Sequence, residues 1–185
     1  MTTSEIRLPL TPARVVAAAM TLADADGLPA LTMRRIAADL GVEPMSLYHH
    51  VPGKDQLLDG LAEAVLAEVA TAVGAAVRDD DDWPTALRAR CLAARTVMVR
   101  HRWAPGLLGS RRSIPAGLYP YYEEILATMV RGGVSYHLAH RAIHALGTMV
   151  LGFTQELFSP DSAGGTLDEE AAEADFAAMA EALPH

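Results

Sequence analysis

Hydrophobic residues recur along this chain every three or four positions, the period of an α-helix, and no useful length alternates as a β-strand would. Hydroxyl residues and prolines stand where several of these periods begin, and glycines stand where several end. The pattern predicts an all-α protein, with helices over residues 12–26, 32–40, 44–51, 54–69 and beyond, 84–101, 119–130 and 134–158.

Several segments between and after these helices have the composition of loops. Asp79 to Asp82 is a run of charge that suits a solvated loop ahead of the next helix. Pro105-Gly106 predicts a turn, and residues 110–115 predict a loop rich in arginine, serine and proline. Residues 160–165 predict a flexible linker, and residues 167–183 predict a weak, acidic helix.

Residues 32–50 have the spacing of a helix-turn-helix, in which two short helices are joined by a tight glycine turn. Ala37 is followed after four residues by Gly41 and after six more by Leu47. A small side chain at Ala37 lets the helices cross closely, and Gly41 supplies the positive φ of the turn. Once the apolar inner face is assigned, the outward residues suit base edges and phosphates in a major groove: Pro44, Met45, Ser46, Tyr48, His49 and His50.

Neither this spacing nor the charge of the chain is enough to predict DNA binding. Two packed helices of any helical protein can show the same spacing. The net charge is −8, and the first sixty residues hold five basic against seven acidic residues, a balance of −2. Because phosphate contacts need basic groups, the prediction of DNA binding depends on where the few basic side chains lie.

The N-terminal residues resemble the signature of the tetracycline-repressor (TetR) family. The resemblance is looser beyond about residue 65, where the chain is similar to the subgroup that contains the tetracycline repressor itself. It implies a helix-turn-helix domain over residues 1–53 and a helical ligand-binding and dimerisation domain over residues 54–185. The resemblance is carried by residues 31–37, 40–42, 46–51 and 54–58, and more loosely by His101-Arg102, residues 132–135 and residues 147–156.

The resemblance also implies which residues bind DNA. Arg34 matches a position that reaches a guanine edge, and residues 44–46 match the base-reading start of the recognition helix. Tyr48, His50 and Lys54 match contacts to phosphates, although partial core packing is an alternative for Tyr48. A proline at position 44 replaces the glutamine of the tetracycline repressor, so the operator sequence does not transfer. The predicted DNA-binding set is Thr32, Arg34, Pro44, Met45, Ser46, Tyr48, His49, His50 and Lys54.

By the same resemblance, the C-terminal helices hold a small effector that shifts the protein between DNA-bound and free states. The family favours a repressor that leaves a palindromic double-stranded DNA operator when the effector binds. The leucine, methionine and tryptophan content of these helices favours an apolar or aromatic molecule. The predicted contacts, for each of which core packing is an equal alternative, are Arg90, Met98, Trp103, Met129, His140, Ile143, His144 and Thr148.

Histidines recur on one face of the predicted helix over residues 134–158, at His137, His140 and His144. Such spacing suits metal ligands, or polarity at an interface or pocket. In the tetracycline repressor, a histidine in the loop after His101-Arg102 helps to hold a magnesium–drug complex. Residues 106–109 contain no histidine, although Glu156 matches an acidic position of that site. We therefore expect no metal and no cofactor, and an effector other than tetracycline.

The helix over residues 134–158 is predicted to pair two copies into a homodimer, since Gly147 and Gly152 permit close approach. In the family a final apolar helix normally completes this interface. None is evident in the sequence, which leaves the completion of the dimer open.

Other functional classes have little support. No phosphate-binding glycine loop, nucleophile elbow or paired His-Glu metal motif occurs, so we expect no enzyme. Cys91, the single cysteine, suits a reducing compartment, and neither a leader nor an apolar run of ~20 residues is evident. We therefore expect a cytoplasmic protein without a membrane partner. The alternative function is a helical interaction module that kept the fold without binding DNA.

Overall fold

The computed structural model of the chain describes residues 9–152, with side chains through Gly147. The expectation of an all-α fold is confirmed, because these residues form helices and no strand. None of these helices is both long and apolar enough to cross a membrane. In chain order the elements are α1 (Pro12–Asp26), the 3₁₀-helix η1 (Leu28–Ala30), α2 (Met33–Leu40), α3 (Pro44–Tyr48), α4 (Lys54–Ala76), α5 (Trp83–Arg100), α6 (Ala104–Ser110), α7 (Leu118–Arg131) and α8 (Tyr136–Gly152).

Side-chain caps fix the starts of three helices. The hydroxyls of Thr11 and Thr32 each accept a hydrogen bond of 3.2 Å from the backbone N–H three residues on, at the starts of α1 and α2. Asp82 caps α5 in the same way, accepting from the N–H of Thr85 at 3.0 Å. Hydrogen bonding from Thr85 lowers the pKa of the Asp82 carboxyl. These caps explain why the predicted starts of α1, α2 and α5 lie within one residue of the observed ones.

The turn predicted at Pro105-Gly106 is wrong, because both residues lie inside α6. Pro105 is in the first turn of α6, where the backbone has no helical acceptor for an N–H, so a proline there begins a helix instead of ending one. The predicted end of the last long helix, the linker at 160–165 and the helix at 167–183 lie outside the described residues.

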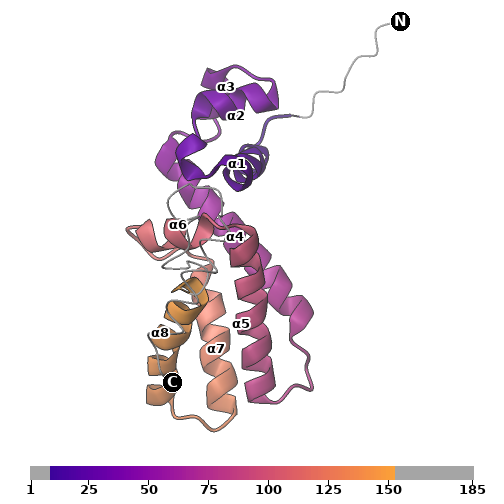
Figure 1. Cartoon of the computed structure of the whole chain (residues 1–185), viewed down its shortest axis with the longest axis vertical. Coiled ribbons are helices and arrows are strands. Elements are labelled where there is room, and N and C mark those ends of the chain that lie inside the picture. Colours follow the sequence, from indigo (N-terminus) through magenta and orange to yellow (C-terminus); the bar gives the residue numbers. More distant parts are fainter. Residues whose placement is uncertain (1–8, 153–185) are drawn as a thin grey trace, which may run out of the picture.

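The molecule is elongated, with α1–α3 at one end and α5, α7 and α8 side by side at the other (Figure 1). Helix α4 runs from one end to the other. Leu57 and Leu61, in its first turns, are buried with α1, α2 and α3 in an N-terminal core. Val65 and Val69, farther along α4, are buried with residues of α5 in a second core. The N-terminal core therefore extends into α4, beyond the boundary predicted at residue 53, and one helix connects both ends.

Candidate DNA-reading helix and small-molecule cavity

The turn between α2 and α3 has the geometry that the sequence predicts. Gly41 ends α2 with φ +65°, in the left-handed region that favours glycine. The N–H of Val42 donates to the carbonyl of Ala37 at 3.0 Å, which closes the turn. Ile36, Ala37 and Leu47 are fully buried between the helices and α1. The predicted inner face is therefore confirmed.

The other side chains of α3 and its end are at least partly open to solvent. Met45 is 69% exposed and Tyr48 42% exposed. His49 is exposed and follows α3, while Pro44, Ser46 and His50 are half-buried. An exposed row of methyl, hydroxyl and ring groups on a short helix can contact base edges and phosphates.

Arg34 and Lys54, the predicted cations, are exposed and form no ion pair or hydrogen bond within the described part of the chain. Arg35, beside Arg34, instead pairs with Asp26 at the end of α1. The Thr32 hydroxyl accepts from the backbone of Arg35, which leaves its own proton free to donate. The helix-turn-helix thus presents one cation at the start of α2 and another at the start of α4.

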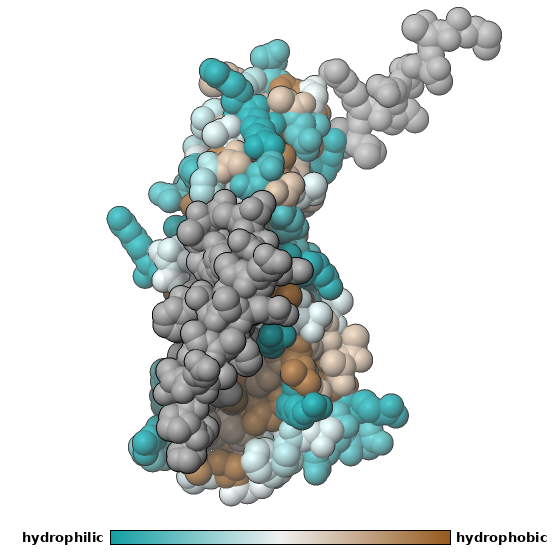
Figure 2. Space-filling view, in the orientation of Figure 1, coloured by the Kyte–Doolittle hydropathy of each residue, from teal (hydrophilic) through white to brown (hydrophobic). Residues whose placement is uncertain are grey.

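A cavity of about 100 Å³ lies in the C-terminal half, among α4, α5, α6, α7 and α8. Figure 2 shows apolar surface gathering in this half of the molecule, whereas the opposite end is mostly hydrophilic in the same view. The walls are apolar apart from two tyrosines. The lining residues are Leu66, Val69, Ala94, Met98, Leu108, Gly109, Pro115, Leu118, Tyr121, Tyr122, Ile125, Leu146 and Gly147.

Of the eight predicted effector contacts, Met98 lines this cavity. Arg90 lies in a separate polar groove of about 530 Å³, where its Nη2 donates to Glu124 at 3.1 Å. Met129 and Ile143 pack in a third core between α7 and α8. Trp103 contacts α1, and His140 and His144 are exposed. The side chain of Thr148 lies outside the described part of the chain, so its predicted contact stays a prediction.

No group of three or more metal-ligating side chains occurs within the described part of the chain. His140 stacks on Tyr136 with ring centroids 6.2 Å apart and meets His144 edge-on at 5.3 Å. Glu156, the acidic position noted in the sequence, lies outside the described residues.

Two tyrosines of the cavity were missed by the sequence prediction. Tyr121 is largely buried, and its hydroxyl is shielded from solvent without a hydrogen-bond partner among the described residues. Burial raises the pKa of Tyr121 far above its usual range, so the phenol stays protonated. Tyr122, half-buried, has its ring centroid 6.0 Å from that of Tyr121. A Cβ on Gly147 of α8 would come within 3.2 Å of the Tyr122 hydroxyl, so this glycine permits a close approach to α7. Its predicted role between two copies of the chain stays a prediction.

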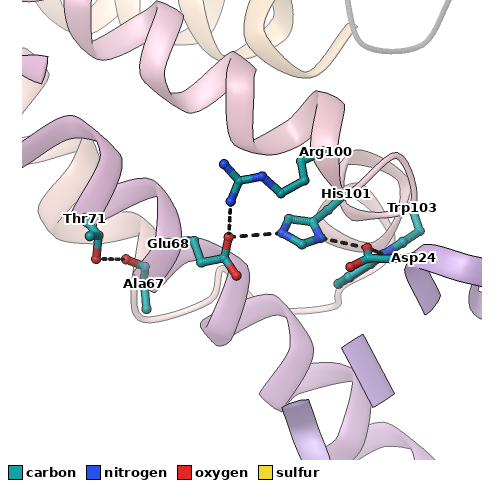
Figure 3. Close-up of polar contacts among 7 residues, drawn as sticks. All are labelled: Asp24, Ala67, Glu68, Thr71, Arg100, His101 and Trp103. Carbon is teal, nitrogen blue, oxygen red and sulfur yellow. Dashed lines mark hydrogen bonds and ion pairs between the residues drawn. The ribbon is translucent and has the colours of Figure 1, made fainter. Parts of the chain in front are cut away.

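A polar cluster joins α1 to α4 and α5, and we call these five residues the junction cluster: Asp24, Glu68, Arg100, His101 and Trp103 (Figure 3). His101 is 3% exposed and lies between two carboxylates, with Nδ1 2.7 Å from Asp24 Oδ1 and Nε2 3.1 Å from Glu68 Oε2. Trp103 Nε1 also donates to Asp24 at 2.6 Å, and Arg100 donates to Glu68 at 3.0 Å.

A second set of contacts ties α6 and α7 to α4. Arg111, directly after α6, lies 3.3 Å from Asp59 and 3.7 Å from Asp55, in the first turns of α4. Glu63 of α4 accepts from the backbone N–H groups of residues 116 and 117, just before α7, at 2.7 and 2.9 Å. The elements around the cavity are therefore linked by ionic and hydrogen-bonded contacts to the helix that supports α1–α3.

The fold and these sites define a class of protein: a helix-turn-helix protein whose helical C-terminal half encloses a small cavity. The chain matches the family model of bacterial regulatory proteins of the tetR family over residues 15–61. It also matches the model of the tetracyclin repressor-like C-terminal domain over residues 77–185, more than half of the chain. The chain belongs to the TetR family.

Relatives of known sequence include two transcriptional regulators. The chain is 38% identical over 122 residues to the HTH-type transcriptional repressor DrrR1 of Streptomyces coeruleorubidus, covering 66% of this chain and 44% of that repressor. It is 30% identical over 184 residues to an HTH-type transcriptional regulator of Saccharopolyspora erythraea, covering 95% of this chain and 75% of that regulator. The aligned part is thus less than half of the first relative and three quarters of the second.

Solved structures show the same architecture. A possible TetR family transcriptional regulator from Streptomyces coelicolor A3(2) matches with a TM-score of 0.73 at 26% identity, covering 90% of this chain and 80% of that one. ActR of Streptomyces coelicolor in complex with actinorhodin matches with a TM-score of 0.66 at 29% identity, covering 80% and 68%. BioQ with its double-stranded DNA operator matches with a TM-score of 0.61 at 32% identity, covering 79% and 86%.

Proposed function

We propose that the protein is a ligand-responsive transcriptional regulator, a repressor that leaves a palindromic DNA operator when a small apolar or aromatic effector binds. It acts as a homodimer in the cytoplasm, and it carries out no catalysis. The observation that carries the proposal is that one helix, α4, contributes both to the predicted DNA-binding unit and to the lining of the cavity. The unpaired Lys54 begins this helix, and Leu66 and Val69, three turns farther on, line the cavity.

DNA reading is supported by the contrast between buried and free groups in the helix-turn-helix. The buried Leu47 fixes α3, so that Met45 and Tyr48 project from it. Arg34 and Lys54 supply cations that are free to meet phosphates or a guanine edge. The proposed DNA-binding set is unchanged from the sequence prediction. Arg35, which is not in that set, pairs with Asp26. BioQ, a structural relative, was solved with a DNA operator.

Effector control is supported by the contacts that surround the cavity. Leu108 and Gly109 of α6 line it, and α6 lies between Trp103 of the junction cluster and Arg111. A molecule that favours one position of α6 therefore also favours one placement of α4 and α1. Thermodynamic linkage then requires only that it bind better to the form that cannot hold DNA. ActR, another structural relative, was solved with actinorhodin bound.

The test is selection from a library of random-sequence DNA duplexes, followed by binding measurements on the selected duplex. We expect a palindromic consensus, which a dimer with two equal reading helices requires. Tyr48→Ala combined with Lys54→Ala should abolish binding, whereas Arg78→Ala, an exposed arginine in the loop between α4 and α5, should leave it unchanged. Failure to select any consensus would overturn the proposal in favour of a helical interaction module.

A further inference from the structure

We propose that Asp26 is a positioning residue that holds the Arg35 guanidinium away from the DNA backbone, and so limits how tightly the helix-turn-helix binds DNA of any sequence. This inference rests on the proposed function, because it concerns the same DNA-binding unit. It assigns a role to a carboxylate and an arginine that both lie outside the proposed DNA-binding set.

Arg35 lies at the edge of the proposed DNA-binding set. It follows Arg34 directly and stands three residues after Thr32, the N-cap of α2, so Arg35 and Thr32 are neighbours on one face of this helix. The backbone N–H of Arg35 donates to the Thr32 hydroxyl at 3.2 Å, which fixes this first turn. A free arginine at this position would reach the phosphates that Thr32 is proposed to meet.

Asp26 engages this guanidinium. It is the last residue of α1, and the 3₁₀-helix η1 brings the chain back to start α2 beside it. The Nη2 of Arg35 donates to the Oδ2 of Asp26, whereas Arg34 has no such partner within the described residues. The side chains of the pair are 45% and 43% exposed, so a phosphate approaching α2 would compete with Asp26 for the arginine.

The small number of cations in the helix-turn-helix makes this pairing important. Residues 9–54 hold four basic side chains, and two of them, Arg34 and Lys54, belong to the proposed DNA-binding set. Because each phosphate contact adds affinity for DNA of every sequence, release of Arg35 would add a third cation to these two. A limited affinity suits a repressor, since an effector can weaken DNA binding only by its own coupling free energy.

The test measures the binding of Asp26→Asn to the selected duplex and to a mixed-sequence duplex by fluorescence anisotropy. The association constant should rise for both duplexes by about threefold for each copy bound, which is the order of what an exposed ion pair contributes. The fall of its logarithm with the logarithm of salt concentration should become steeper by about one for each copy. Asp26→Glu keeps a carboxylate and should bind DNA as the original chain does.

Two further variants separate release of the arginine from loss of a negative charge. Arg35→Ala alone should leave the association constant within about twofold, and in that background Asp26→Asn should lose its effect. Asp39→Asn is the matched control, because Asp39 is an exposed carboxylate of α2 with no ion pair within the described part of the chain. This control should leave the salt dependence unchanged.

The possible outcomes distinguish this inference from the proposed function. If Arg35→Ala weakens binding as much as Lys54→Ala does, Arg35 already contacts DNA and the inference is wrong. It is also overturned if Asp26→Asn gives no gain, if the gain persists in the Arg35→Ala background, or if Asp39→Asn matches it. In these cases the DNA-binding function stands. If neither duplex binds the original chain, both the inference and the proposed function are wrong.

Discussion

Arg34 and Arg35 are adjacent in the chain, yet their surroundings give them different roles. Arg35 is paired with Asp26, whereas Arg34 meets no described partner and points from the start of α2. The tyrosines differ in the same way. Tyr48 is exposed on α3, while Tyr121 has its hydroxyl enclosed beside the cavity. Residue type therefore indicates what a side chain can do, and its neighbours decide whether it is free to do it.

Cys91 gives a prediction at this scale. Burial raises the pKa of its thiol, so at pH 8 the folded chain holds less thiolate than the unfolded chain. Reaction with Ellman's reagent at pH 8 should therefore be markedly slower in buffer than in urea. Because burial raises this pKa in the folded state, the thiol's contribution to stability is fully present below the ordinary thiol pKa and is lost as the pH rises from there through the raised pKa of the folded state. Equal rates in the two solvents would show that the thiol is open to solvent.

At the scale of single elements, the turn of the helix-turn-helix depends on one backbone conformation. Gly41 has φ +65°, and a Cβ there would meet no atom within 4 Å, so the cost of a side chain is conformational and not steric. Gly41→Ala should lower the free energy of unfolding by about 1 kcal/mol. Urea denaturation followed by circular dichroism measures the change.

Gly74 of α4 is the matched control for that substitution. A Cβ at Gly74 also meets nothing within 4 Å, but its φ is not positive and it lies inside a helix. Gly74→Ala should therefore raise the free energy of unfolding by about 0.5–1 kcal/mol. If both substitutions had the same sign, the left-handed turn would not be what Gly41 provides.

At the scale of the whole molecule, the junction cluster connects residues far apart in the chain. A double-mutant cycle of Asp24→Ala and His101→Ala should give a coupling free energy of about 1–2 kcal/mol, since a buried ring hydrogen-bonds a carboxylate. The exposed pair Arg78 and Asp80 is the control, and its coupling should stay below about 0.5 kcal/mol. A negligible coupling between Asp24 and His101 would remove this cluster from the connection between the two ends.

Helices and turns that depend on neighbouring residues could be predicted from the sequence, whereas contacts between segments far apart in the chain could not. Ala37 and Gly41 are about one helical turn apart in the sequence, so their spacing predicts the helix-turn-helix directly. Asp24, by contrast, meets His101 across 77 positions and Trp103 across 79, and no local pattern signals either contact. The cavity draws its lining from five helices, so the predicted set included Met98 but missed Tyr121. Periodicity identifies buried faces, but not which buried faces meet around an empty space.

The salt dependence of DNA binding tests the central claim most directly. With the selected duplex, the logarithm of the association constant should fall linearly with the logarithm of salt concentration. Lys54→Ala should reduce this slope by about one for each copy bound, while Arg78→Ala should leave it unchanged. A slope that Lys54→Ala leaves unaltered would contradict the placement of this lysine on the DNA backbone, and with it the helix-turn-helix as the DNA-reading unit.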